Sequence, residues 1–291
     1  MKLNEINIRD PFVLPYGGIY YMYGTRGADC WGECNGFDVY MSDNLRDWSE
    51  AIEVFHKPEG FWADRNYWAP EVHEYNGRFY AFVTFKSPTH VRGTQILVSD
   101  TPLGPFQIHS DGPVTPTDWE CLDGTFYVDN KGVPYMVFCH EWLQVGDGKM
   151  CLIQLTPDLM GAASKPLVLF SASELQWTTC TMEDRISYVT DGPYLYQTKG
   201  LNGGKAPLLM LWSSHSKDGY AEAIAISEAG NIEGPWKHAE ELLYTKDGGH
   251  GMIFQTFEGK LLLALHTPNH TLEERPIFLP LEEREQMIYV L

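Results

Sequence analysis

Three aspartates hold matching places in a repeated sequence phrase and could together supply acid and base chemistry. Asp10, Asp123 and Asp191 open strand-like runs that read Asp-Pro-Phe-Val, Asp-Gly-Thr-Phe and Asp-Gly-Pro-Tyr. An ionised carboxylate can activate water while a protonated one assists a leaving oxygen, and a third charge nearby raises the pKa of the acid. Carboxyl pairs of this kind are the minimum set for hydrolysing a glycosidic bond. A single Asp-Pro or Asp-Gly is an ordinary turn dipeptide, so the recurrence carries the argument.

The phrase recurs five times along the chain. Two further copies open on Ala69-Pro-Glu-Val and His250-Gly-Met-Ile, and the step between copies is roughly 55 to 70 residues. Each copy leads to a glycine and a second apolar strand, beginning at Gly18, Gly77, Gly132, Gly204 and Gly259. Hairpins repeated at this period predict an all-β fold, a five-bladed β-propeller with four-stranded antiparallel blades.

The repeat fills the chain and predicts one propeller domain over residues 1–291. The expected blades run approximately over 5–55, 67–112, 120–172, 188–245 and 247–291. Strand 1 of every blade lies at the axis of a propeller, so we expect the three aspartates to converge on one face. The 2–3 loops and the 4–1 crossovers build that same face. They carry several tryptophans, including Trp31, Trp68 and Trp142. Aromatic rings between carboxylates suit a sugar-binding cleft, and an oligosaccharide is the expected partner.

The bulk properties exclude some partners. A net charge of −18 and a pI near 4.8 argue against nucleic acid and against an anionic membrane surface. No signal peptide or apolar stretch of about 18 residues is visible. The six cysteines form no paired Cys-x-x-Cys units. Buried free thiols in a reducing compartment are the simplest interpretation, which predicts a cytoplasmic protein.

Four segments give the chain a family resemblance. Arg9-Asp10-Pro-Phe-Val, Trp68-Ala-Pro-Glu-Val, Leu122-Asp123-Gly-Thr-Phe-Tyr-Val-Asp129 and Gly249-His250-Gly together resemble glycoside hydrolase family 43, over a span from Asp10 to about Pro276. The resemblance implies a five-bladed propeller and an inverting enzyme acting on α-L-arabinofuranosides or β-D-xylosides, with galactofuranosides a further candidate. It also implies that Asp10 is the general base and that Asp123 raises the pKa of the acid and orients it.

The general acid is where the chain departs from this family. The family's usual acid is the glutamate of a Glu-Gly-Pro segment opening blade 4, and here that segment reads Asp191-Gly-Pro. Aspartate is one methylene shorter, which sets its proton about 1.5 Å further back unless the backbone compensates. Asp191 is the first candidate. Glu141, in His140-Glu-Trp142, is the second, and Glu183 is the third.

Two basic residues complete the expected site. The resemblance places His250 at the central channel, where family members hold a water or a cation. The residues alone leave open a water ligand, a neighbour of a calcium site or a hydrogen-bonded core histidine. We expect no metal and no other cofactor. Arg275 could reach a substrate hydroxyl, pair with a channel aspartate or form a blade-closing salt bridge.

The preferred function is an inverting glycoside hydrolase that releases terminal pentose or furanose units from oligosaccharides. A catalytically silent sugar-binding propeller is the alternative, because the blade 4 glutamate is missing. A retaining hydrolase of the fructan type is a third possibility. Retention requires carboxyl groups about 5 Å apart, whereas inversion requires roughly 6.5–9.5 Å.

Overall fold

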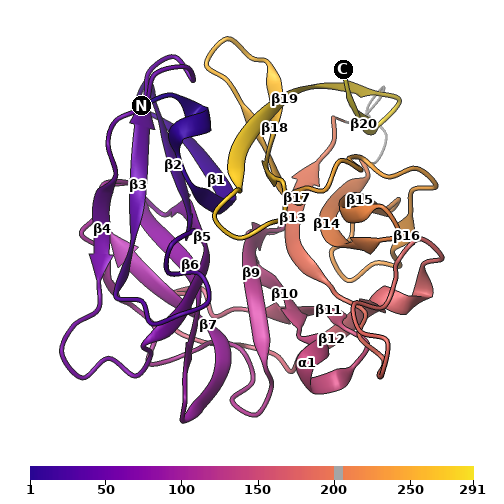
Figure 1. Ribbon diagram of the computed structural model, residues 1–291, viewed down its shortest axis with the longest axis horizontal. Helices are drawn as coiled ribbons and strands as arrows, with labels where there is room; N and C mark the ends of the chain where they lie inside the picture. Colours follow the sequence, from indigo (N-terminus) through magenta and orange to yellow (C-terminus); the bar gives the residue numbers. More distant parts are fainter. Residues whose placement is uncertain (200–205) are drawn as a thin grey trace.

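The computed structural model describes residues 1–199 and 206–291 and contains five four-stranded antiparallel sheets arranged in a ring (Figure 1). Blades 1 and 2 comprise β1 (Ile8–Tyr16), β2 (Ile19–Arg26), β3 (Gly36–Ser42), β4 (Ile52–His56), β5 (Arg65–Tyr75), β6 (Arg78–Ser87), β7 (His90–Ser99) and β8 (Gln107–Ile108). Blade 3 comprises β9 (Cys121–Val128), β10 (Pro134–His140), β11 (Lys149–Gln154) and β12 (Leu167–Ser171). Blades 4 and 5 comprise β13 (Asp191–Gln197), β14 (Leu208–Ser216), β15 (Gly219–Ser227), β16 (Lys237–His238), β17 (Gly249–Gln255), β18 (Leu261–Thr267), β19 (Arg275–Arg284) and β20 (Met287–Val290).

The predicted five-bladed propeller is therefore confirmed. Each sheet follows sequence order from its inner to its outer strand. The helical segments are short and consist of η1 (Leu3–Glu5), α1 (Trp142–Val145) and η2 (Ala172–Glu174). Within the described residues no helix is long and apolar enough to cross a membrane. Gly204, expected to open the second strand of blade 4, lies outside the described residues, and β14 begins at Leu208.

Tight turns and apolar strands explain why the chain forms these hairpins. Asn76 and Gly77, between β5 and β6, both have positive φ, at 51° and 77°. A two-residue turn of this kind matches the right-handed twist of the flanking strands. The strands are strongly apolar, and neighbouring sheets pack face to face. Between blades 3 and 4, for example, fully buried Trp212 packs against Phe170 at a ring-centroid distance of 5.2 Å.

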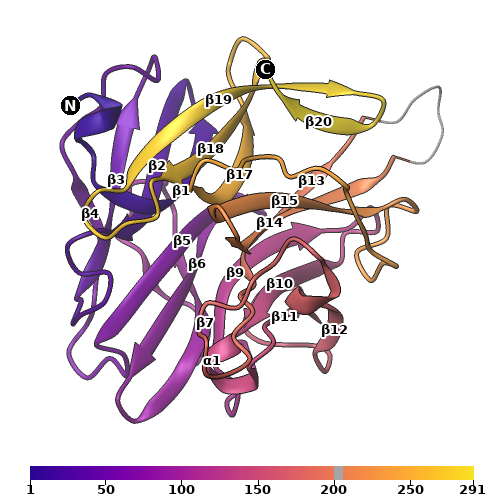
Figure 2. The same cartoon turned by 45° about the vertical axis from the view of Figure 1, so that its right-hand side comes forward.

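The ring closes between blades 5 and 1 through side chains, because β1 and β20 each pair only within their own blade. Figure 2 shows η1 and β1 beside β19 at this junction. The Arg275 guanidinium donates to the backbone oxygens of Asn4 (2.9 Å), Leu272 (3.1 Å) and Glu274 (2.7 Å). Arg275 thus joins blade 5 to the N-terminal segment. Of the three alternatives left open by the sequence, this arrangement is nearest to the blade-closing contact, although the partners are backbone oxygens and Arg275 does not line the central cavity.

Every inner strand is interrupted by a bulge with a left-handed residue at a matching position, and β5 has a second bulge with left-handed Asn66 (φ 53°). The residues at the matching position are Asp10 (φ 54°), Ala69 (φ 44°), Asp123 (φ 54°), Gly192 (φ 52°) and His250 (φ 53°). The expected equivalence of the three aspartates is therefore wrong by one residue in blade 4. Asp191 lies just before the bulge, at the position that Arg9 and Trp68 hold in blades 1 and 2. Left-handed backbone in Asp10, Asp123 and His250 is strained for a side-chain-bearing residue, and such strain concentrates at functional sites.

Candidate active site

One cavity of about 700 Å³ lies on the face where the inner strands begin, and all five blades line it. Of the residues expected in the site, it contains Asp10, Trp31, Trp68, Asp123, Glu141, Trp142, Asp191 and His250. Arg275 and Glu183 are not among its lining residues, and Glu183 is exposed in the β12–β13 connection. The three aspartates converge because Asp10 and Asp123 lie in the bulges of their inner strands and Asp191 lies just before one. All three carboxyls line the same cavity.

Asp10 is held as an ionised carboxylate. The Thr25 hydroxyl donates to its Oδ2 at 2.6 Å, and Nδ1 of His250 lies 3.2 Å from its Oδ1. Burial alone would raise the pKa of Asp10. The positive charge of His250, its hydrogen bond and the charge of Arg9 outweigh burial and hold this pKa well below its usual range. An ionised, well-oriented carboxylate is what a general base requires.

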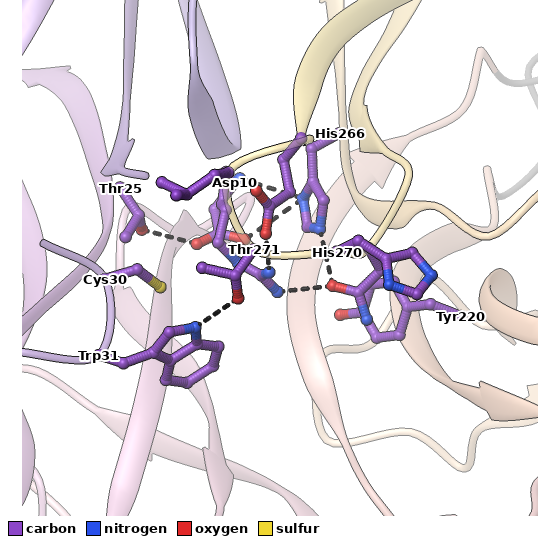
Figure 3. Close-up of polar contacts among 12 residues, drawn as sticks. Asp10, Thr25, Cys30, Trp31, Tyr220, His266, His270 and Thr271 are labelled. Atoms are coloured by element: carbon purple, nitrogen blue, oxygen red, sulfur yellow. Dashed lines mark hydrogen bonds and ion pairs between the residues drawn. The ribbon is translucent and has the colours of Figure 1, made fainter. Parts of the chain in front are cut away.

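The two histidines beside Asp10 differ in charge, because His266 is neutral and His250 is positively charged at neutral pH. The backbone N–H of Asp10 donates to Nδ1 of His266 at 3.2 Å, so this ring nitrogen is an acceptor and carries no proton. Figure 3 shows Asp10 between Thr25 and His266. Burial lowers the pKa of His266 to about 4. Burial also disfavours the charged form of His250, but Asp10 and Asp123 overcome it and raise the pKa of His250 to about 10. His250 is therefore an imidazolium at neutral pH.

The sequence left open whether His250 neighbours a bound cation. Over residues 1–199 and 206–291, no group of three or more His, Cys, Asp or Glu side chains is arranged to hold one. In this structure His250 contacts Asp10 and lies 3.8 Å from Asp123 Oδ2.

Asp123 and Asp191 both favour the protonated state. Burial raises the pKa of Asp123 to about 7, with the charges of Asp191 and Asp10 adding to it and that of His250 opposing it. Burial likewise raises the pKa of Asp191, against His250 and His215. The Gly192 N–H donates to Asp123 Oδ2 at 3.1 Å, and the Tyr220 hydroxyl lies 3.1 Å from Asp191 Oδ2. The site thus combines one carboxylate whose pKa is held low with two whose pKa values are raised.

Asp123→Asn is expected to stabilise the fold while impairing the site. The folded protein holds the Asp123 proton more tightly than the unfolded chain, so its stability falls from pH 3.8 up to about 7 and then levels off. The neutral amide removes this penalty. We expect the free energy of unfolding to rise by about 1–2 kcal/mol at pH 8 and to change little near pH 4. Urea unfolding at both pH values measures the difference. A variant less stable than wild type at pH 8 would contradict the charge assignment.

Glu141 is committed to an ion pair. Its carboxylate accepts from the buried Arg92 guanidinium, which lies 4.4 Å above the Trp68 ring and 3.4 Å from Asn66 Oδ1. Protonating this carboxylate would leave the buried Arg92 guanidinium without its charged partner. The arrangement favours Asp191 over Glu141 as the proton donor. Arg92 was not anticipated from the sequence, because nothing in its strand marks it.

Aromatic side chains flank the carboxylates. Trp31, in the β2–β3 loop, is 60% exposed, and its indole N–H donates to Thr271 Oγ1 at 2.8 Å (Figure 3). The Trp31 and Trp68 rings meet edge to face at 5.3 Å. Across the site Trp142 begins α1, with the Arg185 guanidinium 5.4 Å from its ring. Rings on both sides of the acidic groups, exposed at Trp31 and half-buried at Trp142, can stack on the C–H faces of sugars.

Several supporting residues were missed because their partners come from distant parts of the chain. Arg9 forms an ion pair with Glu274 at 2.7 Å and donates to Asn269 Oδ1 at 2.7 Å. Tyr220 reaches Asp191 from β15. From the sequence, Arg9 is recognised only as part of the Arg-Asp-Pro-Phe-Val motif. Its positive charge next to Asp10 was the signal that could have identified it as a site residue.

Comparison with known proteins agrees with this geometry. The model of the family described as glycosyl hydrolases family 43 matches residues 4–283. The chain belongs to this family. The resemblance inferred from the sequence motifs is therefore confirmed, and family 43 is a family of glycosidases.

Individual relatives are similar to differing extents. The crystal structure of an endo-arabinase from Bacteroides thetaiotaomicron VPI-5482 is 37% identical, with a TM-score of 0.88 over 98% of each chain. An extracellular endo-α-(1→5)-L-arabinanase of Bacillus subtilis is 25% identical over 56% of this chain and 53% of its own length. A xylosidase/arabinosidase 43A of Humicola insolens is 26% identical over 48% of this chain and 46% of its own length. The matches thus span about half the length of these last two proteins.

Proposed function

We propose that this family 43 protein hydrolyses α-L-arabinofuranosidic bonds in arabinan-type oligosaccharides with inversion of configuration. The observation that carries the proposal is the contrast in protonation within one cavity. Asp10 is held ionised, whereas burial raises the pKa of Asp191, which favours its protonated form. Asp10 is the general base, Asp191 the general acid, and Asp123 the neighbouring charge that raises the pKa of the acid.

The reaction uses one water and conserves protons. Asp10 accepts a proton from the water as its oxygen attacks the anomeric carbon. Asp191 gives its proton to the departing glycosidic oxygen as that bond breaks. Thr25 and His250 occupy part of the acceptor capacity of Asp10, and a carboxylate has about four lone-pair sites, so room remains for the water. Proton exchange with solvent then restores both groups.

Substrate class is supported by similarity and by the shape of the site. The relative that is 37% identical over nearly its full length is an endo-arabinase. The cavity extends from the exposed Trp31 past the aspartates to Trp142 and Leu143, which offers contacts to more than one sugar unit. Both observations support cleavage inside a chain rather than the release of terminal units expected from the sequence.

Linear α-1,5-linked arabino-oligosaccharides test this proposal. We expect hydrolysis to give products of two or more units early in the reaction, with the newly formed reducing end first appearing as the β-anomer in ¹H NMR. Release of arabinose alone would overturn internal cleavage. A first-formed α-anomer would overturn inversion and favour a retaining mechanism. Binding without turnover would favour the silent sugar-binding propeller.

A further inference from the structure

A second regularity links each blade to the next. In every blade, one residue of strand 2 pairs with the residue just before the inner-strand bulge. These strand 2 residues are Thr25, Thr84, Cys139, Ser213 and His266. They occupy one structural position, and the sulfur of Cys139 is a weaker hydrogen-bond acceptor than the hydroxyl or imidazole nitrogen of the other four.

In four blades this side chain accepts the backbone N–H of the left-handed residue in the following blade. The bonds are Ala69 N–H to Thr25 Oγ1 (2.8 Å), Asp123 N–H to Thr84 Oγ1 (2.9 Å), His250 N–H to Ser213 Oγ (2.7 Å) and Asp10 N–H to His266 Nδ1 (3.2 Å). Each bond fixes the bulge that presents the axial side chain. Blades 1, 2, 4 and 5 therefore each supply the acceptor for the next blade.

Blade 3 is the exception. Cys139 holds the accepting position there, and its fully buried thiol is a weak acceptor. The left-handed residue of the following blade is Gly192, and its N–H donates to Oδ2 of Asp123 instead, at 3.1 Å. Asp123 therefore replaces the missing hydroxyl. Because Gly192 directly follows Asp191, the backbone beside one aspartate is bonded to the carboxylate of the other.

We propose that Cys139 is a positioning residue whose failure to accept leaves the Gly192 N–H to Asp123, so that this hydrogen bond favours the ionised form of Asp123. The inference rests on the acid role proposed for Asp191. A backbone N–H can only donate, so it favours the ionised form of the carboxylate that it contacts.

Other charged and polar groups near the pair act electrostatically on both carboxyls or on Asp191 alone. His250 from β17 and Asp10 from β1 act on both carboxyls. Arg92 from β7 and Tyr220 from β15 also lie close enough to interact electrostatically with both. His215 from β14 acts on Asp191. The Tyr220 hydroxyl donates to Asp191 Oδ2 and lowers the pKa of Asp191, as the Gly192 N–H lowers that of Asp123.

Cys139→Ser and Cys139→Ala separate this role from packing. The serine hydroxyl is nearly isosteric with the thiol and supplies the acceptor found in the other blades, so it competes for the Gly192 N–H. The alanine supplies no acceptor and leaves a small cavity. Packing alone predicts that Cys139→Ala is the more damaging change. The proposal predicts the reverse order for catalysis and for carboxyl protonation. Cys139→Thr supplies the hydroxyl a second time if the serine variant fails to fold.

Carboxyl ¹³C NMR of aspartate-labelled protein gives a readout that does not require turnover. The Asp123 and Asp191 signals are assigned by their loss in Asp123→Asn and Asp191→Asn. In Cys139→Ser we expect the Asp123 carboxyl to titrate about 0.5 to 1 pH unit higher than in wild type, and Cys139→Ala to keep the wild-type titration. On arabino-oligosaccharides kcat of Cys139→Ser should fall about three- to tenfold, with the acidic limb of its pH profile moved upward.

Each result bears on the proposal. A serine variant with wild-type titration and rate would overturn it, as would an alanine variant that shifts Asp123 equally. If wild type fails to cleave arabino-oligosaccharides but Cys139→Ser still shifts the Asp123 signal, the proposed substrate is wrong and the positioning role stands.

Discussion

Asp10→Asn is expected to lower kcat on arabino-oligosaccharides by about 10³-fold while KM changes less than about threefold. The amide cannot accept the proton of the attacking water, yet it fills the same space and can still accept from the Thr25 hydroxyl. Initial-rate kinetics and calorimetric binding of an oligosaccharide measure the two effects. Asp100→Asn, an exposed aspartate paired with Arg78 on blade 2, is the matched control and should retain wild-type activity. Retention of more than a few per cent of the wild-type rate would remove Asp10 from the base role.

The same substitution should also change His250. The pKa of this imidazole is raised to about 10 against the effect of burial, chiefly by the charge of Asp10 and then by that of Asp123. Loss of the Asp10 charge should bring the His250 titration down toward neutrality, which NMR of the imidazole ring can follow. An unchanged His250 titration would mean that Asp10 is not its principal partner.

The propeller could be predicted because its signals are local and repeated. A turn, an apolar strand, a glycine and a second strand recur in each blade, and short-range chemistry determines all of them. The exception was the alignment of the repeats in blade 4. Aligning Asp191 with Asp10 matched the residue type, whereas the backbone aligns Pro11 with Pro193 and so makes Gly192 the equivalent of Asp10.

The prolines were the available signal for this register. Pro11, Pro70 and Pro193 each follow a left-handed residue. Their common spacing would have placed Asp191 one position earlier, at the level of Arg9 and Trp68. Asp191 lies one residue before the bulge, so its carboxyl extends from a different backbone position than those of Asp10 and Asp123. This difference in position accompanies the different role, general acid, that we propose for Asp191.

Other parts of the site could not be read from local sequence. Arg92 and Glu141 meet across 49 positions of the chain, and Arg275 bonds a carbonyl 271 positions away. Whether a basic residue faces substrate or closes the ring depends on which blades become neighbours. The motif around Asp10 has a local signature, but the histidines that determine its charge come from blade 5. Residue types at the centre were predictable, whereas their ion pairs depended on the assembled ring.

The general acid is the point on which the chain departs from its family, and leaving-group dependence identifies it. Asp191→Ala should lower kcat on arabino-oligosaccharides by about 10³-fold but by less than about tenfold on a 2,4-dinitrophenyl glycoside of an arabino-oligosaccharide, because an activated phenol departs without protonation. Asp191→Glu should recover part of the loss on oligosaccharides if the space beside Tyr220 accepts the extra methylene. Comparing the two substrates for each variant separates lost proton transfer from lost binding.

Glu141→Gln provides the decisive contrast, since Glu141 is the other buried carboxyl considered for this role. It should destabilise the protein, because the buried Arg92 guanidinium loses the charge that compensates it, and should slow both substrates to a similar extent. Thermal unfolding measures the first effect and the ratio of the two rates the second. If Glu141→Gln instead spared only the activated substrate and Asp191→Ala slowed both equally, the proton donor would lie in blade 3. Asp191 would then act through binding, while Asp10 would keep its place as the base.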